Sequence, residues 1–341
     1  MEKTMTEARF YHISKAGVMK QTRGLEDALE ALKDDGYIWL DYYQPTKEDL
    51  SRLIEPLGLH PLSIEDCIDE NQIPKIDDYP RNTFILFNAF HTSAGKLSVS
   101  EVDTFLGRNF LVTVSSSNSH NQSLLINIQR SVVNESESVK HGPAFLLHII
   151  LDQVVDEKFL AIEALEEKLN DGEEIILSNL DKFDPSELMH LRRDLLTVRK
   201  SLFHEREILV KVCRRDSPFI PAKAVYLYRD IYDHLSKFFE LTESYRDLVT
   251  SLMEMYLSML NNRMTKAAND TNLIVRRLTF ITTIFMPLTL LAGIGGMSEW
   301  SMMTGPQNWR VAYPVFLLAM VVIAVINYFI IKWIEKRRSR I

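Results

Sequence analysis

Two long uncharged runs of residues constrain the fold of this chain more than any other feature of its sequence. The first run, 278–294, has 17 residues, and the second, 311–331, has 21. A helix needs about 20 apolar residues to cross a hydrocarbon core roughly 30 Å thick. Two such runs placed close together favour membrane spans over the alternative of two buried core helices. We therefore predict transmembrane helices over 278–297 and 311–331, joined by a loop over 298–310.

Basic residues flank both runs on the same side. Arg276 and Arg277 precede the first run, and residues 332–341 form a tail with five Lys or Arg side chains against one Glu. Because positive residues stay on the cytoplasmic side of a membrane, both termini are predicted to be cytoplasmic and the 298–310 loop extracytoplasmic. Residues 1–10 lack the apolar segment of a signal peptide. We therefore expect a cytoplasmic domain attached to the cytoplasmic (inner) membrane.

Residues 1–140 have the mixed pattern of an α/β domain. Thr46, followed three residues later by Asp49, is typical of a helix N-terminus. Gly107, Arg108 and Asn109 separate two strand-like segments and fit a three-residue hairpin turn. The pattern leaves the order of the strands open. The expected strands are 37–43, 83–90, 101–106 and 110–114, and the expected helices are 25–32 and 47–54.

From residue 141 the pattern becomes helical. Apolar residues follow helical spacing over 144–177, with an interruption only at Gly172. Asp184, as a cap, and Pro185, at the first helical position, predict the start of a second helix, which we expect to end near Arg214.

A third helical stretch, 222–294, has no Pro before Pro287 and no Gly before Gly293. As one helix, its 73 residues would extend about 110 Å. A helix of that length must pack against neighbours or against copies of itself. Residues 141–277 are therefore predicted to form a helical domain with a stalk helix that continues into the first span. The whole chain is expected to be an α+β membrane protein.

One face of the long helix carries small and polar residues. Positions that alternate steps of four and three residues share one stripe of a helix. Small and hydroxyl residues also favour close packing of membrane helices, so a packing seam and a pore lining are both open interpretations. The stripe continues upstream of the apolar run, which favours the pore, and one chain with two spans needs a ring of copies to enclose it. The stripe consists of Asn261, Thr265, Ala268, Asn272, Val275, Thr279, Thr282, Met286, Thr289, Gly293 and Gly296.

Charge and cysteine content exclude several other functions. The net charge of −7 argues against a general nucleic-acid binder. Cys67 and Cys213 are the only cysteines, which is unlike a disulfide framework or a cysteine-based zinc or redox site. No phosphate-binding glycine loop and no nucleophile–base pattern stands out. An enzyme is therefore not expected.

Several segments occur in an order that is characteristic of one family. They are residues 60–66 (His-Pro-Leu-Ser-Ile-Glu-Asp) with 73–75 (Ile-Pro-Lys), 228–234 (Tyr-Arg-Asp-Ile-Tyr-Asp-His) and 283–294 (Thr-Ile-Phe-Met-Pro-Leu-Thr-Leu-Leu-Ala-Gly-Ile). Together with two terminal spans and a basic tail, they make the chain similar to the CorA family of divalent-cation (magnesium/cobalt) channels over about 35–341. The resemblance implies a homopentamer with a funnel-shaped cytoplasmic domain, a pore along the first span, and a second span that faces lipid.

The resemblance also implies roles for individual residues. Family pore-lining or gating positions match five residues, and the stripe adds Thr282 and Gly293. The five are Asn272, Val275, Leu278, Met286 and Thr289. The ligands of regulatory divalent ions, bound between neighbouring cytoplasmic domains, match Asp66, with Glu65 beside it, and Asp230. Solvated surface charge is the alternative for these three carboxylates. The implied ion, both regulatory and transported, is Mg²⁺, with Co²⁺ and Ni²⁺ as further cargo.

The end of the first span departs from the family pattern. Where the family has Tyr-Gly-Met-Asn, this chain has Gly295, Gly296, Met297 and Ser298. Mg²⁺ gives up its water reluctantly, and the carboxamide oxygens of the family filter are thought to hold the hydrated ion. A serine hydroxyl is shorter and leaves a wider ring, in which backbone carbonyls of the two glycines could substitute. We expect altered or relaxed ion choice at this filter, not loss of transport.

Two other functions remain open. The zinc-transporting ZntB branch of the same superfamily shares the architecture and also lacks the usual filter ending. The nine histidines of this chain do not cluster along the predicted pore, so zinc ligation is not evident there. A membrane-anchored metal sensor that conducts nothing is the second alternative, and the polar stripe argues against it.

Overall fold

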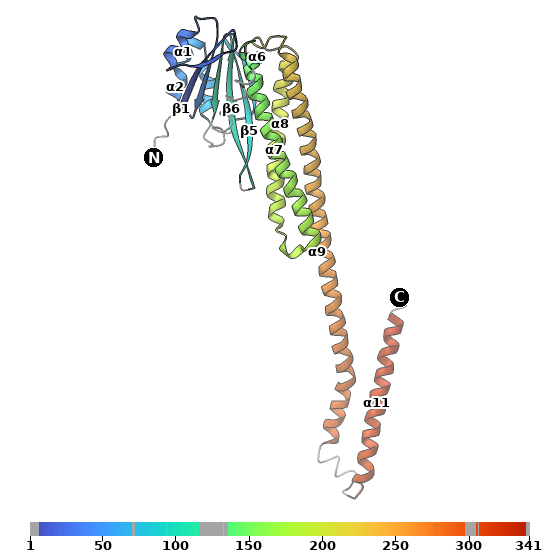
Figure 1. Cartoon of the computed structure of the whole chain (residues 1–341). Coiled ribbons are helices and arrows are strands. Elements are labelled where there is room, and N and C mark those ends of the chain that lie inside the picture. Colours follow the sequence, from blue (N-terminus) through green and yellow to red (C-terminus); the bar gives the residue numbers. More distant parts are fainter. Residues whose placement is uncertain are drawn as a thin grey trace. The chain divides into compact units, whose positions relative to one another are not determined.

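The computed structural model describes residues 7–69, 72–93, 95–115, 132, 136–296, 305 and 307–338. They fall into two compact units, Met1–Tyr256 and Leu257–Ile341 (Figure 1). The boundary between the units lies within α9 (Val225–Gly295), which contributes residues to both.

The N-terminal unit contains a seven-stranded sheet with the order β2-β1-β3-β7-β6-β5-β4. β3 and β7 pair in parallel, and the other neighbours pair antiparallel. A parallel pair needs a crossover connection, and here the connection from β3 to β7 contains helices as well as β4, β5 and β6. The strands are β1 (Glu7–Ser14), β2 (Met19–Gln21), β3 (Gly36–Tyr43), β4 (Lys75–Asp78), β5 (Asn82–Ser93), β6 (Lys96–Gly107) and β7 (Phe110–Ser115).

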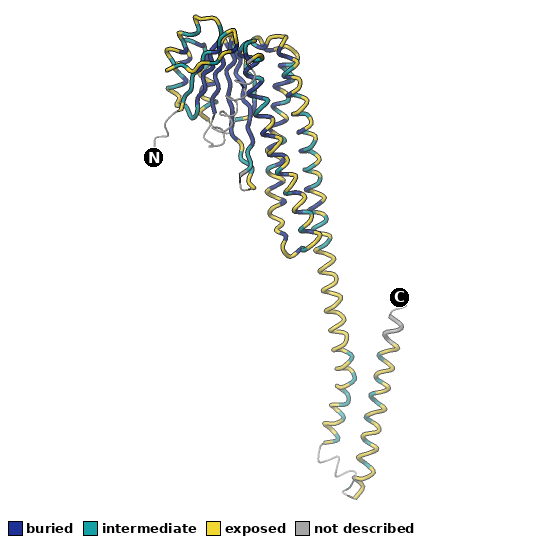
Figure 2. The backbone as a smooth tube through the Cα atoms, viewed as in Figure 1, coloured by how far each residue is buried: buried dark blue, intermediate teal, exposed yellow. Residues whose placement is uncertain are grey.

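Short helices pack against one face of this sheet. Ala28, Leu50 and Ile64 from these helices form one buried cluster with Leu40 and Phe84 of the strands. Figure 2 shows the strands as the most continuously buried part of the chain. The helices are α1 (Leu25–Ala31), α2 (Lys47–Ser51), α3 (Ile54–Leu57) and α4 (Pro61–Ile68).

Long helices complete the N-terminal unit. α7 contacts β5, β6, β7 and β3, and α8 packs against α7 and β4. Their inner faces are lined by buried aliphatic side chains such as Leu165, Leu169 and Leu202, which is the stripe that helical spacing places on one side. The helical elements are α6 (Ser136–Val139), α7 (Pro143–Ser178), a 3₁₀ turn at Leu180–Lys182, α8 (Pro185–Cys213) and the first part of α9.

Most of the expected elements are confirmed, with three differences. Strands β3, β5, β6 and β7 and the helices α1, α7, α8 and α9 lie where the sequence predicted them. The expected helix 47–54 is instead two short helices, because the chain turns after Ser51, where Leu53 N–H donates to the Leu50 carbonyl. Gly172 does not interrupt α7; it is buried, and an added Cβ there would lie 3.8 Å from the Phe183 ring. The strands β1, β2 and β4 and the short helices α4 and α6 were not predicted.

The C-terminal unit consists of the second part of α9 and α11 (Trp309–Arg338). Both helices are long and apolar enough to cross a membrane, α11 over Arg310–Trp333, and in the most apolar stretch of each no residue is buried within the chain. The predicted fold class is therefore confirmed: an N-terminal α/β unit, a long helix, and two apolar helices at the C-terminal end.

Candidate pore helix and metal sites

The predicted pore residues are exposed along α9. Val275, Leu278 and Met286 are 53%, 60% and 76% exposed, and such large apolar side chains are normally buried by folding or by a partner. The remaining predicted pore residues of this helix, Asn272, Thr282, Thr289 and Gly293, are exposed as well.

The half-buried positions of the same segment form a second face of α9. Gly295 on this face lies against α11, because an added Cβ would be 2.8 Å from the Phe316 ring. At 100° per residue, this face lies about 180° around the helix from the polar stripe. The stripe therefore points away from α11, and a Cβ added at Gly293 would meet no atom within 4 Å. The half-buried residues are Phe280, Ile284, Pro287, Leu288, Leu291 and Gly295, and on α11 Ala312, Phe316, Met320, Ile323, Ala324, Asn327 and Ile331.

The threonine hydroxyls of the stripe bond back to the helix. Thr279 donates to the Val275 carbonyl at 2.9 Å, Thr282 to Leu278 at 2.7 Å, and Thr289 to Phe285 at 2.9 Å. Each hydroxyl hydrogen is thus engaged, while the oxygen keeps a lone pair that can accept a hydrogen bond. Such oxygens suit the water shell of a cation, which offers only hydrogen-bond donors.

A groove of about 820 Å³ runs along this face of α9. Thr282, Met286, Thr289 and Gly293 line it, together with apolar neighbours such as Phe285. At the end of the helix, Gly296 follows the last turn and donates its N–H to the Ala292 carbonyl at 3.0 Å. The other predicted filter residues, Met297 and Ser298, lie outside the described residues.

Glu65 and Asp66 lie on α4, and both carboxylates pair with lysines. Glu65 accepts from Lys47 at 2.8 Å, and this bond lowers the pKa of the Glu65 carboxyl. Asp66 accepts from Lys75 of β4 at 2.6 Å. Asp66 is the less exposed of the two, with 21% of its side chain accessible against 51% for Glu65. A metal ion at Asp66 would compete with the Lys75 ammonium.

A buried acidic group lies next to Asp66. The Cys67 thiol interacts with Asp103 of β6, which is 2% exposed. Burial, reinforced by the neighbouring Glu101, raises the pKa of Asp103 well above its usual range. Burial also raises the pKa of the Cys67 thiol, so this cysteine is not a reactive thiolate. Sequence reasoning missed Asp103, because nothing in the strand pattern placed it beside α4.

Asp230 lies on an exposed turn of α9 that faces acidic residues of α7. Burial lowers the pKa of His148 on α7, and the carboxylates of Asp152 and Asp230 oppose this shift. Burial raises the pKa of Asp156 on the same helix; the Asp152 carboxylate adds to this shift, and His234 opposes it. Positions 148, 152 and 156 of α7, and positions 230 and 234 of α9, are four residues apart. This spacing could have identified one polar surface on each helix.

The described part of one chain holds no cluster of three or more His, Cys, Asp or Glu side chains arranged for a metal ion. Asp66 pairs with Lys75 rather than with Asp230. The donor chemistry nevertheless fits Mg²⁺, because carboxylate oxygens are the ligands that this hard cation prefers. The resemblance to the family implies that the ligands come from neighbouring copies, in which case a single chain would present only part of the site.

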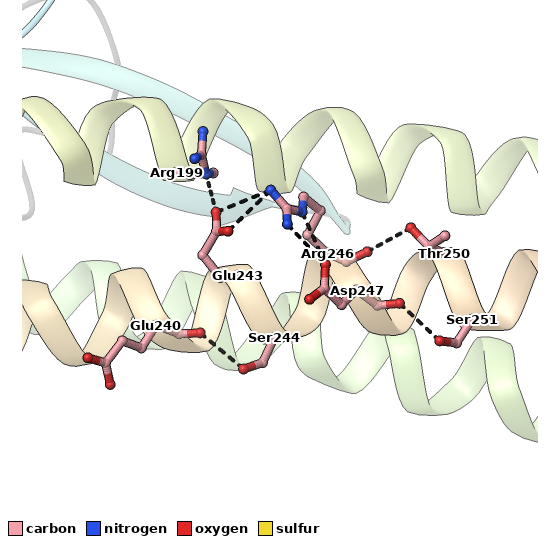
Figure 3. Close-up of polar contacts among 8 residues, drawn as sticks. All are labelled: Arg199, Glu240, Glu243, Ser244, Arg246, Asp247, Thr250 and Ser251. Atoms are coloured by element: carbon pink, nitrogen blue, oxygen red, sulfur yellow. Dashed lines mark hydrogen bonds and ion pairs between the residues drawn. The ribbon is translucent and has the colours of Figure 1, made fainter.

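Ionic contacts also join α8 to α9 (Figure 3). Glu243 of α9 accepts from Arg199 of α8 and from Arg246 one turn along α9, the latter at 3.2 Å. The Arg206 guanidinium of α8 also lies 4.8 Å from the centre of the Phe239 ring. These contacts tie the first part of α9 to α8 within the N-terminal unit.

Known proteins resemble the chain over nearly its whole length. The cobalt/magnesium transport protein CorA of Thermotoga maritima is 30% identical over 315 residues, which are 90% of this chain and 85% of the relative. The CorA protein of Methanocaldococcus jannaschii is 25% identical over 322 residues, covering 93% and 97% of the two chains.

Solved structures share the fold. The complete CorA magnesium transporter from Methanocaldococcus jannaschii superposes with a TM-score of 0.68 at 23% identity and covers 97% of this chain and 98% of that one. The ZntB cytoplasmic domain from Vibrio parahaemolyticus gives a TM-score of 0.57 at 12% identity over 74% of this chain and 98% of that one. The family described as "CorA-like Mg2+ transporter protein" matches residues 34–337. The chain therefore belongs to the CorA-like family of divalent-cation transporters, whose members are transporters and not enzymes.

Proposed function

We propose that copies of this chain assemble into a ring, a homopentamer, and conduct divalent cations along α9 into the cytoplasm. The observation that carries the proposal is the exposed polar stripe on the face of α9 opposite the one that packs on α11. A ring with α9 inside and α11 outside would cover the exposed Val275, Leu278 and Met286 and turn the threonine oxygens toward a central path.

Mg²⁺ is the proposed principal cargo, with Co²⁺ and Ni²⁺ as further cargo. Because Mg²⁺ gives up water reluctantly, the ion would pass in hydrated form, and Thr282 and Thr289 would accept hydrogen bonds from its water shell. Leu278 and Met286 would form apolar constrictions that stop conduction by dewetting. Gly296, Met297 and Ser298 would form the outer filter, while Asn272, Val275 and Gly293 line the remaining path.

The membrane potential would supply the driving force. Both termini are proposed to be cytoplasmic, with 278–297 and 311–331 as the spans, 298–310 as the outer loop and 332–341 as an inner basic tail. Residues 1–140 and 141–277 then form the cytoplasmic α/β and helical domains. An inside-negative potential favours entry of a divalent cation by about 4.6 kcal/mol per 100 mV, so passive flow is sufficient.

Carboxylates of the cytoplasmic unit would close the channel when cytoplasmic metal is plentiful. Asp66, assisted by Glu65, would exchange Lys75 for Mg²⁺ and share the ion with Asp230 of a neighbouring copy. Asp152 and Asp230 both act electrostatically on His148, so they contribute to one acidic surface. Without the ion, these carboxylates repel one another across the interface and the stalk loosens. In this way the carboxylates would act as a negative-feedback valve that responds to cytoplasmic metal.

Isosteric substitutions on and off the stripe test the pore. The single variants Thr282→Val and Thr289→Val each remove one oxygen from the stripe. Each should lower Mg²⁺ influx into liposomes about tenfold, which corresponds to a barrier raised by about 1.4 kcal/mol. Thr283→Val is the matched control, because Thr283 lies off the stripe and bonds back to Thr279 at 2.7 Å in the same way. Equal loss in all three variants would indicate a helix defect and would contradict the assigned lining.

A further inference from the structure

A cavity of about 670 Å³ lies in the N-terminal unit, outside the pore helix and the predicted metal site. It is formed by the end of α1, by α3, by the β4–β5 and β6–β7 turns, by the start of α7, and by the loop between α8 and α9. Its volume falls in the range of about 300–1,000 Å³ that is typical of small-molecule sites.

The lining of this cavity is cationic although the chain as a whole is acidic. Arg81, Arg108 and His141 line it, and no Asp or Glu is among its lining residues. The chain carries a net charge of −7. Arg108, on the turn after β6, forms no hydrogen bond or ion pair within the part of the chain that the structure describes. An exposed arginine in this position has its donors available for a ligand.

Arg81 is held in place without being neutralised. Its guanidinium donates to the carbonyls of Glu55 and Pro56, at 3.1 and 2.5 Å. Its side chain crosses Gly58, where an added Cβ would lie 2.6 Å from Arg81 Cδ, and the φ of Gly58 is +72°. The backbone carbonyls fix the position of the guanidinium, but no carboxylate cancels its charge among the described residues. The positive charge at this wall of the cavity is therefore preorganised.

His141 and the first turn of α7 complete the polar wall. The Nδ1 atom of His141 lies 3.0 Å from the Glu137 carbonyl, which leaves Nε2 as the ring nitrogen available to a ligand. Pro143 and Ala144, at the N-terminus of this 36-residue helix, also line the cavity. The helix dipole adds to the attraction that the side chains exert on an anion.

Apart from Asn109, the remaining side chains of the lining are apolar. Phe110 and Phe219 line the cavity together with Leu32, Leu57 and prolines 56, 80, 218 and 221. Inorganic anions gain nothing from such walls, whereas an anion attached to a flat organic group buries that group against them. Guanidinium groups match phosphate geometry especially well.

We propose that this cavity binds a small organic phosphate, with the phosphate held by Arg81, Arg108 and His141 and the organic part packed against Phe219 and the prolines. The ligand contacts the Pro218–Pro221 loop, which directly precedes α9. Binding is therefore expected to change metal flux, and this effect on flux rests on the proposed channel function. Binding of the ligand to the cavity is independent of that function.

Calorimetry with AMP on the full chain in nanodiscs tests the site. AMP is a suitable probe because a single phosphate binds Mg²⁺ weakly and does not deplete the metal. Arg108→Gln should weaken AMP binding about tenfold, which corresponds to 1.4 kcal/mol. Arg192→Gln, which removes the same charge from an exposed position of α8, should leave it unchanged. Phe219→Ala should weaken AMP binding but not the binding of inorganic phosphate.

Three outcomes would overturn the proposal. They are no heat of binding for AMP, equal affinity of AMP for wild type and Arg108→Gln, and affinity for inorganic phosphate as high as for AMP. If AMP binds as expected but leaves Mg²⁺ flux unchanged in a conducting preparation, the regulatory consequence is wrong and the binding site stands. A preparation that binds AMP and conducts no ion would contradict the channel alone.

Discussion

Lys158 Nζ of α7 lies 2.6 Å from Glu205 Oε1 of α8, and both side chains are completely buried. The same Glu205 oxygen accepts the Asn88 N–H of β5 at 2.9 Å, and Lys158 also donates to the Asn88 carbonyl. The ammonium lies 4.6 Å from the centre of the Phe90 ring. One ion pair thus joins the sheet to two long helices of the N-terminal unit.

Breaking this pair should destabilise the protein strongly. Lys158→Met leaves the Glu205 carboxylate buried and uncompensated, which should lower the free energy of unfolding by about 3–5 kcal/mol. Lys158→Met combined with Glu205→Leu should recover most of that loss, because no charge remains buried. Urea denaturation of the full chain, followed by fluorescence of the buried Trp39, measures both effects.

A matched control separates burial from loss of any ion pair. Lys15 pairs with Asp35 at the same distance, 2.6 Å, but the two side chains are 71% and 82% exposed. Lys15→Met should therefore change the unfolding curve little. Equal effects of Lys158→Met and Lys15→Met would show that the buried pair has no special role in stability.

Asp41 of β3 gives the stability a pH dependence. Burial raises the pKa of Asp41 to about 6, and the Thr113 hydroxyl, which donates to it at 2.7 Å, opposes the shift. A carboxyl with a raised folded-state pKa holds its proton more tightly when folded, so its contribution to stability falls as pH rises from about 4 to about 6.

Asp41→Asn should remove this dependence. The amide oxygen can still accept from Thr113, and no charge is buried, so the variant should be more stable than wild type above pH 6, by about 1–3 kcal/mol. The advantage should shrink toward pH 4. Thermal unfolding between pH 4 and 8 measures it, and parallel pH profiles of the two proteins would contradict the assignment.

Metal-dependent closure depends on Asp230 in the proposed valve. Asp230→Ala removes one carboxylate from the predicted intersubunit site, so Mg²⁺ influx should stay high when internal metal is raised to a concentration that closes the wild type. Asp233→Ala on an exposed position of the same helix is the control. Unchanged closure in Asp230→Ala would remove this residue from the gating role.

Ser298 is expected to set ion preference. Ser298→Asn restores the side chain that is usual in the family, so the order in which Mg²⁺, Co²⁺ and Ni²⁺ permeate should shift in favour of Mg²⁺. Competition between these ions during uptake into liposomes measures the order. If serine and asparagine give the same order, the filter hypothesis for this residue is wrong.

Local patterns in the sequence were sufficient to predict the long helices and the central strands. The uncharged runs and the stripe of α9 are visible because helical spacing repeats along the chain. β4 was missed because Lys75–Asp78 is mostly charged and becomes a strand only by pairing with β5. The parallel pairing of β3 with β7 joins distant segments, and no local pattern reports it.

The candidate site residues also fall into two groups, those that a local pattern can place and those that only the fold brings together. The stripe lies on one helix, so spacing alone could place it, whereas Asp230 was expected only from the resemblance to the family. Asp103 beside Cys67, and Asp152 opposite Asp230, depend on how separate elements pack. Arg81 and Arg108 come from different hairpin turns, and only the folded sheet brings both to one cavity.

The most direct test of the account is Mg²⁺ influx into liposomes that contain the purified chain, with and without an imposed inside-negative potential. If the chain forms the proposed channel, Mg²⁺ enters at a rate that increases with the size of the potential. Zinc entry without Mg²⁺ entry would instead favour a zinc transporter. No flux of Mg²⁺, Co²⁺, Ni²⁺ or Zn²⁺ from a folded, oligomeric preparation would contradict the channel and favour a non-conducting sensor.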